Sequence, residues 1–265
     1  MRFQKLIFIL LLFYTASFAY TDNDIDGVDD AIDQCLNTPF DELVDEKGCS
    51  SNESYHGTLT LKLGSDISFN TFSDKTTNFN LFSNYRYNNW DISLSSSNYS
   101  TYDSFNEASS SAGDLYLSGG YLFKAKEFNT KVTLGTKLAT ADEDVGTGEN
   151  DYFASVNFDY FVNQRQDIFL YYGYTMSGNS TEVDYEDYYS YSVGSGYAVN
   201  RKWYSSLSYD YSGSQYPDGE AYSSLSWFNS YEFTKQFFAT LNYSNGLDDI
   251  SYDHTISLKF GVRFE

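Results

Sequence analysis

Residues 250–264 read ISYDHTISLKFGVRF, and their alternation decides the fold. One parity of this stretch is apolar or aromatic: His254, Ile256, Leu258, Phe260, Val262 and Phe264. The other parity is polar or charged: Ser251, Asp253, Thr255, Ser257, Lys259 and Arg263. Because successive side chains of a strand point to opposite faces, this period of two predicts a strand with one apolar and one polar face.

The same contrast recurs upstream, and it predicts about twelve strands from Ser54 to the end of the chain. The first three are expected near 55–64, 78–87 and 90–97, and only Asn88-Asn89 separates the second from the third, which is typical of a tight hairpin. No Lys, Arg, Asp or Glu falls on the apolar face of the predicted strands. A charge-free outer face favours contact with lipid.

The last eight residues of that stretch, SLKFGVRF, resemble the C-terminal assembly signal of Gram-negative outer-membrane β-barrels, with Phe264 as the terminal aromatic. The resemblance implies an all-β fold, an antiparallel transmembrane β-barrel. It also implies insertion by the barrel-assembly machinery through the C-terminal strand. Outer-membrane lipid is expected at the charge-free face. Lipopolysaccharide is expected at the acidic outer loops, which would attract the divalent ions that bridge it, although a solvated loop face explains their charge equally well. Short connections alternate with longer ones, which predicts periplasmic turns at one end and extracellular loops at the other.

Composition agrees with paired strands. The chain has 265 residues, 20% of them aromatic, and only 2 Pro. A mean hydropathy of -0.47 is low because a membrane barrel alternates apolar with polar residues. The formal net charge of -21 disfavours nucleic-acid binding.

The chain begins with the features of a secretory signal peptide over 1–19. Arg2 and Lys5 precede an apolar run, and Ser17-Phe18-Ala19 forms a small-x-small cleavage site. Export together with a strand array predicts the outer membrane, with the segment before the barrel in the periplasm.

An acidic segment, 20–53, separates this leader from the barrel at 54–265. Its carboxylates follow a D-x-D-x-D-G spacing that suits an oxygen-loving cation such as calcium. The segment resembles a thrombospondin type 3 repeat, as found in linkers of OmpA-family proteins. The resemblance assigns calcium to Asp22, Asp24, Asp26, Asp30 and Asp33. The alternative is a solvated acidic leader.

Cys35 and Cys49 are the only cysteines, and in an oxidising compartment they are expected to form a disulfide.

The inward face of the predicted barrel is mostly Ser, Thr, Asn, Gly and Tyr. Its candidate pore-lining charges are Lys62, Arg86, Lys259, Arg263, Asp159 and Asp210. Barrel closure would place the four cations on one wall, where they could select solutes by charge. The alternative is that the charges pair across the lumen and make it rigid. Inward aromatics would narrow or block the bore: Phe82, Phe153, Phe161, Phe169 and Phe228.

These features favour a porin-like channel for the passive passage of small hydrophilic solutes, and not an enzyme. A structural or adhesive barrel remains as the alternative, because a filled barrel needs no pore. Twelve-stranded outer-membrane phospholipases use an outward Ser, His and Asn set, and His254 faces outward, but no Ser follows it in a matching motif.

Overall fold

The computed structural model describes residues 28, 32–35, 44, 47–49, 57–70, 75–102, 108–125, 127–141, 148–180 and 184–264. The chain divides into two compact units, 1–52 and 53–265. The predicted signal peptide lies outside the described residues. No helix in the described part of the chain is long and apolar enough to cross a membrane.

The second unit consists of twelve strands. They are β1 (Thr58–Phe69), β2 (Lys75–Tyr87), β3 (Trp90–Tyr102), β4 (Ala108–Lys124), β5 (Phe128–Leu138), β6 (Asp151–Phe161), β7 (Gln166–Met176), β8 (Tyr188–Asn200), β9 (Trp203–Ser212), β10 (Tyr222–Glu232), β11 (Phe237–Gly246) and β12 (His254–Phe264). Every strand pairs antiparallel with its neighbours in sequence, and β1 pairs with β12 to close the barrel. The predicted fold class is confirmed.

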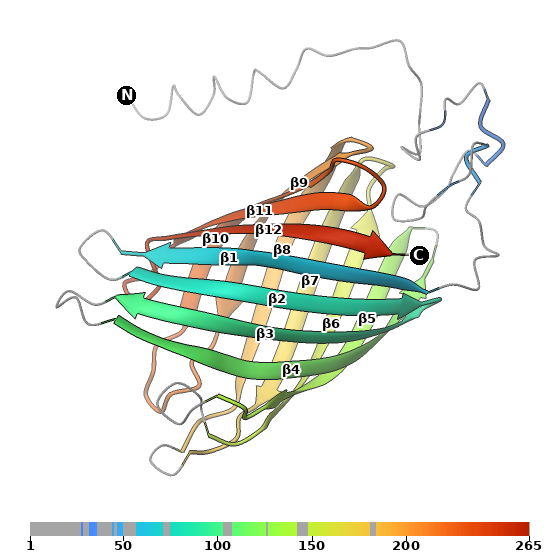
Figure 1. Ribbon diagram of the computed structural model, residues 1–265. Helices are drawn as coiled ribbons and strands as arrows, with labels where there is room; N and C mark the ends of the chain where they lie inside the picture. The colour runs from blue at the N-terminus through green and yellow to red at the C-terminus, as the bar shows by residue number, and fades with distance from the viewer. Residues whose placement is uncertain are drawn as a thin grey trace, which may run out of the picture. The chain divides into compact units, whose positions relative to one another are not determined.

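The closing pair joins the first strand to the last, and Figure 1 shows them side by side. In this ladder Leu59 lies opposite Phe264, and Phe69 lies opposite His254. The two ends of the barrel sequence therefore meet along one seam, which leaves no strand edge unpaired.

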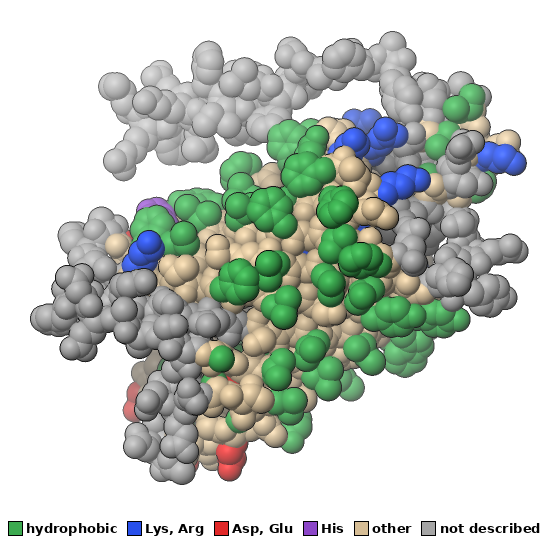
Figure 2. All heavy atoms as spheres, in the orientation of Figure 1, with side chains coloured by type: hydrophobic (Ala, Val, Ile, Leu, Met, Phe, Trp, Pro, Cys, Tyr) green, Lys and Arg blue, Asp and Glu red, His purple; other side chains and the backbone are tan. Residues whose placement is uncertain are grey.

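The outward parity carries large apolar side chains that are open to the surroundings. Leu207 is 65% exposed and Trp90 is 63% exposed, and many other large apolar side chains are exposed with them, whereas a soluble protein rarely exposes an extended apolar surface. Hydrophobic side chains spread over the visible face of the barrel in Figure 2, and charged side chains gather toward its ends. This apolar belt is the surface that lipid chains solvate in a membrane-spanning barrel.

Connections at the two ends differ in length. The end that holds Thr58 and Phe264 has the short turns, among them the Asn88-Asn89 hairpin, where Asn88 has a φ of 52°. Asn tolerates this left-handed conformation better than most residues. The longer loops, including 139–150, 177–187 and 213–221, lie at the opposite end, so it is called the loop end below.

The first strands are longer than the alternation predicts. β1 continues to Phe69, β2 begins at Lys75, and β3 continues to Tyr102. The added part of β3, 98–102, reads NYSTY, and the part of β4 that pairs with it, 108–112, reads ASSSA, so neither shows an apolar and polar contrast in sequence. These parts of β3 and β4 pair with each other, so the backbone hydrogen bonds of the sheet continue past the apolar belt.

Candidate functional site: the charged lumen

Barrel closure brings three of the predicted lumen cations together. Lys62 lies opposite Gly261 on β12, two residues along that strand from both Lys259 and Arg263. Both of these cations lie near enough to Lys62 to repel its ammonium. Strands β12 and β1 therefore form a basic wall.

Two aromatic rings flank the ammonium of Lys62. Its Nζ lies 5.1 Å from the centre of the Phe82 ring and 5.8 Å from that of Phe238. The guanidinium of Arg263 lies 4.5 Å from the same Phe238 ring. Ring faces attract cations, but they do not neutralise them.

Carboxylates pair with the two other cations of the basic wall. Lys259 lies 3.7 Å from Asp66, and Arg263 forms an ion pair with Glu232. Within the described barrel Lys62 has no ion pair. Lys62, Lys259 and Arg263 thus exceed their two carboxylate partners by one positive charge.

Arg86 stands apart from this group. It lies near the end of β2 opposite Thr58, whereas Lys62 lies opposite Phe82, four residues further along. Its side chain is exposed at the turn end of the barrel. The structure therefore brings three of the four predicted cations together and leaves Arg86 at the rim.

The two predicted acidic residues lie away from the basic wall: Asp159 is on the far side of the ring, and Asp210 is about a quarter of the ring away, three strands from β12. β7 is six strands from β1 in either direction, and Asp159 and Asp210 lie on β6 and β9. Asp210 accepts hydrogen bonds from the hydroxyls of Ser192 and Ser208.

Sequence reasoning missed a third carboxylate, Asp167 on β7, which accepts from the Tyr204 hydroxyl at 3.1 and 3.2 Å. Its inward parity is the signal that could have identified it.

Ion pairs in the described barrel run along the wall. Each joins strands no more than two apart in the ring. Lys131 on β5 lies 2.8 Å from Asp91 on β3, and Lys137 on β5 lies 2.8 Å from Asp151 on β6. These pairs lie along the wall, and among the described residues none bridges the bore.

Glycines receive several of the inward rings. A Cβ added at Gly135 would collide with the Phe153 ring, and one at Gly261 would collide with the Phe238 ring. Phe169 lies against Gly194 in the same way. Rings that lie over a glycine on the next strand stay close to the wall, so these three do not reach straight across the lumen.

One acidic residue of the loop end is a structural anchor. Asp248 accepts hydrogen bonds from the backbone N–H and the hydroxyl of Ser223 at 2.6 and 2.7 Å. It also accepts from the backbone N–H of Ser251 at 2.8 Å. Burial raises the pKa of the Asp248 carboxyl, but the hydrogen bonds from Ser223 and Ser251 outweigh it and lower the pKa to about 2.

The Asp248 anchor should therefore resist acid. A lowered pKa means that the anchor stabilises the fold above the ordinary Asp pKa of about 3.9 and is lost as pH falls through the folded value of about 2. We expect the amide resonances of Ser223 and Ser251 to titrate together near that pH in NMR spectra. Asp248→Asn should abolish the transition, and a midpoint near the ordinary pKa would contradict the anchor.

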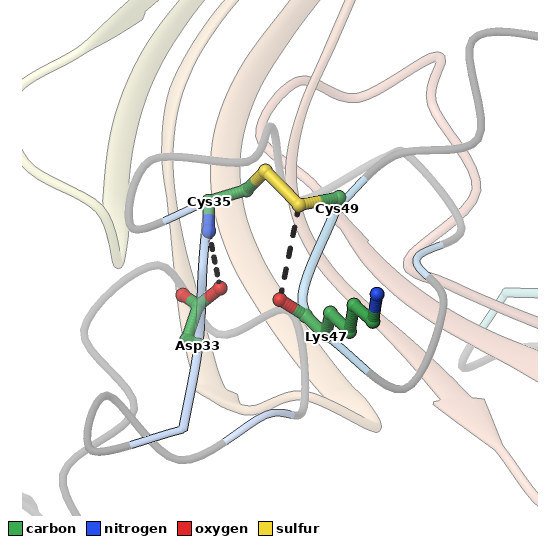
Figure 3. Close-up of a disulfide and its surroundings, with 4 residues drawn as sticks. All are labelled: Asp33, Cys35, Lys47 and Cys49. Carbon is green, nitrogen blue, oxygen red and sulfur yellow. Dashed lines mark hydrogen bonds between the residues drawn. A yellow bond between two sulfur atoms is a disulfide. The ribbon is translucent and has the colours of Figure 1, made fainter.

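The first unit contains the predicted disulfide. Cys35 and Cys49 are bonded, with an S–S distance of 2.00 Å (Figure 3). Asp33 Oδ1 accepts a hydrogen bond from the Cys35 backbone N–H at 2.7 Å. Asp33 Oδ2 is buried and has no hydrogen-bond partner among the described residues, as a carboxylate oxygen available to a cation would be. The other four predicted calcium ligands lie outside the described residues.

His254, which suggested the phospholipase alternative, is held by aromatic residues. Its Nδ1 and the Tyr243 hydroxyl share a hydrogen bond of 2.9 Å. Its ring lies 5.3 Å from that of Phe69 and 5.9 Å from that of Tyr243. This arrangement fits an interfacial side chain near the loop end.

A closed antiparallel barrel with an even number of strands, an apolar outer belt and a polar lumen defines the class of outer-membrane β-barrels. No protein-family model and no curated protein matches the sequence. The fold is similar to that of an outer-membrane channel from Pseudomonas putida F1, with a TM-score of 0.59 and 10% identity over 78% of this chain and 94% of that one.

Two porins of known structure have the same architecture. The NanC porin has a TM-score of 0.55 and 12% identity over 78% of this chain and 99% of its own. The KdgM porin has a TM-score of 0.54 and 12% identity over 78% of this chain and 98% of its own. Because the sequence identities are this low, the likeness establishes the fold alone.

Proposed function

We propose that the barrel is a porin-like channel for the passive passage of small hydrophilic solutes, and that it favours anions at the basic wall. The observation that carries the proposal is Lys62. Its ammonium lies inside the barrel with no ion pair among the described residues, next to two further cations. Lys62 is half-buried, and an unpaired cation that has lost part of its water is costly, so a purely structural lumen would favour a carboxylate partner for it. An anion in transit would compensate it.

The rest of the lumen supports passage. Ser, Thr and Asn side chains offer hydrogen bonds to solutes, and the glycines described above keep Phe153, Phe169 and Phe238 near the wall. Twelve strands enclose less space than the sixteen to eighteen of general porins, which suits small solutes. A further KdgM structure, with a TM-score of 0.53, is in complex with disordered oligogalacturonate, whose carboxylates illustrate an anionic solute in this fold.

Cysteine labelling tests whether the lumen is the path. Thr240 faces inward on β11, beside Lys259 on β12, and its neighbour Leu241 faces outward. We expect a sulfonate-bearing methanethiosulfonate reagent to lower the ion current of Thr240→Cys in a planar bilayer, because it adds bulk and negative charge to the path. Leu241→Cys should be unaffected. Equal responses of the two variants would contradict passage through the lumen.

The apolar outer belt also indicates where in the cell the barrel lies. The apolar belt fits the outer membrane, and the terminal strand β12 offers the barrel-assembly machinery its alternating side chains. Lipopolysaccharide would surround the loop end, and the first unit would lie in the periplasm. Protease access to the first unit from outside intact cells would contradict this orientation.

For the first unit we infer calcium binding by Asp33 together with Asp22, Asp24, Asp26 and Asp30. The buried, unpartnered Oδ2 of Asp33 supports this assignment. Calcium would bind these oxygens and neutralise their charge.

Calorimetry on the full-length chain tests the calcium assignment. We expect binding at about 10⁻⁴–10⁻³ M calcium, the range of extracellular modules, and about tenfold weaker binding for Asp33→Asn, because affinity follows the number of charged ligands. Glu220→Gln, an exposed change in the second unit, is the control and should bind as the unmodified chain does. Absence of heat at millimolar calcium would leave a solvated acidic leader.

A further inference from the structure

The loop-end half of the lumen contains a pocket of about 340 Å³. Its walls come from β4, β6, β7, β8 and β9. β4 and β9 are five strands apart in a ring of twelve, so the pocket occupies the bore itself. Its volume lies within the range of small-molecule sites, about 300–1,000 Å³. None of its lining residues belongs to the basic wall.

Aromatic side chains of inward parity line this pocket. Tyr116, Phe153, Tyr171 and Tyr188 line it, and all four have inward parity. Phe153 is held over Gly135, and the Tyr171 hydroxyl lies against Gly173. Tyr116 is 41% exposed and Tyr188 is half-buried, so a solute can reach them.

The polar groups of the pocket are hydroxyls. Thr175, Ser190 and Ser212 line it beside the tyrosines, and no charged side chain does. Hydroxyls both donate and accept hydrogen bonds, so they match a solute that carries hydroxyls of its own. A charged solute would lose hydration here without gaining a charged partner.

We infer that this pocket is a binding site for the pyranose ring of a saccharide in transit. A pyranose has flat C–H faces, which lie against aromatic rings, and a rim of hydroxyls, which bond to Thr, Ser and Tyr hydroxyls. Both requirements are met by one pocket that lies in the bore. The inference rests on the proposed channel function and names the solute class of its loop-end half.

Block of the ion current by maltotriose tests the inference on the full-length protein in a planar bilayer. We expect maltotriose to reduce the current reversibly, and a flexible ethylene glycol oligomer of similar size to reduce it much less. Tyr188→Ala should raise the half-blocking concentration about fivefold or more, because one stacking ring is lost. Tyr189→Ala, the adjacent outward residue, should leave it unchanged. Tyr116→Ala should behave like Tyr188→Ala.

Two results would overturn the saccharide site while the channel stands. One is equal block by the glycol oligomer and maltotriose, and the other is equal half-blocking concentrations for Tyr188→Ala and Tyr189→Ala. If the protein carries no current, the proposed channel function fails, and calorimetry with maltotriose in detergent decides the site separately. Heat that survives in Tyr189→Ala and is lost in Tyr188→Ala would support it, and no heat would overturn it.

Discussion

Lys137→Met is expected to lower the free energy of unfolding of the barrel by about 3–5 kcal/mol, because it leaves two buried carboxylates without their cation. Lys137 Nζ lies 2.8 Å from Asp151 and 3.9 Å from Asp114, and the side chains of all three residues are less than 10% exposed. Both carboxylates also accept hydrogen bonds from backbone groups of the loops. Asp114 accepts from the backbone N–H of Thr140, and Asp151 accepts from that of Gly178. Loss of the cation should therefore loosen the loop end as well.

Urea unfolding in lipid vesicles measures this effect. Lys202→Met is the matched control, because Lys202 is exposed in the turn between β8 and β9. The control should change the unfolding free energy by less than about 1 kcal/mol, as exposed charges do. A Lys137→Met variant as stable as the control would show that the buried network contributes little.

Lys62→Glu is expected to reverse the ion preference of the channel. The change removes one positive charge and adds one negative charge beside Lys259 and Arg263, so the basic wall would lose its excess of positive charge. The ratio of anion to cation permeability should fall about tenfold, within the range by which charged clefts concentrate counter-ions. Lys62→Met keeps the contact with Phe82 and Phe238 but lacks the charge, so its ratio should be intermediate.

The reversal potential under a salt gradient measures that ratio. Lys235→Glu is the control, because it makes the same change of charge on an exposed turn between β10 and β11. It should shift the reversal potential much less than Lys62→Glu. Equal shifts would place the selectivity at the mouth of the barrel and not at the basic wall.

The sequence predicts the strand number and the outward face because both follow from a local period of two. Leu207 and Trp90 illustrate this, since their parity alone assigns them to the exposed apolar belt. The third strand was predicted to end too early because its last residues, 98–102, read NYSTY and have no such contrast. The disulfide was predictable because Cys35 and Cys49 are the only candidates.

The site was predictable only in part, because its contacts join distant strands. Lys62 meets Phe238 across the β1–β12 closure, and no local pattern indicates how the register aligns them. The tyrosines of the loop-end pocket were missed for the same reason. Inward parity alone selects Tyr116 and Tyr188, but their shared pocket depends on the curvature of five strands.

Single-channel recording of the unmodified full-length protein in a planar bilayer tests the channel proposal most directly. The basic wall and the polar lumen predict discrete current steps and, under a potassium chloride gradient, a reversal potential of the sign that anion passage gives. A correctly folded barrel, shown by a change in gel migration on heating, that gives no current steps would contradict the channel and favour a structural or adhesive protein.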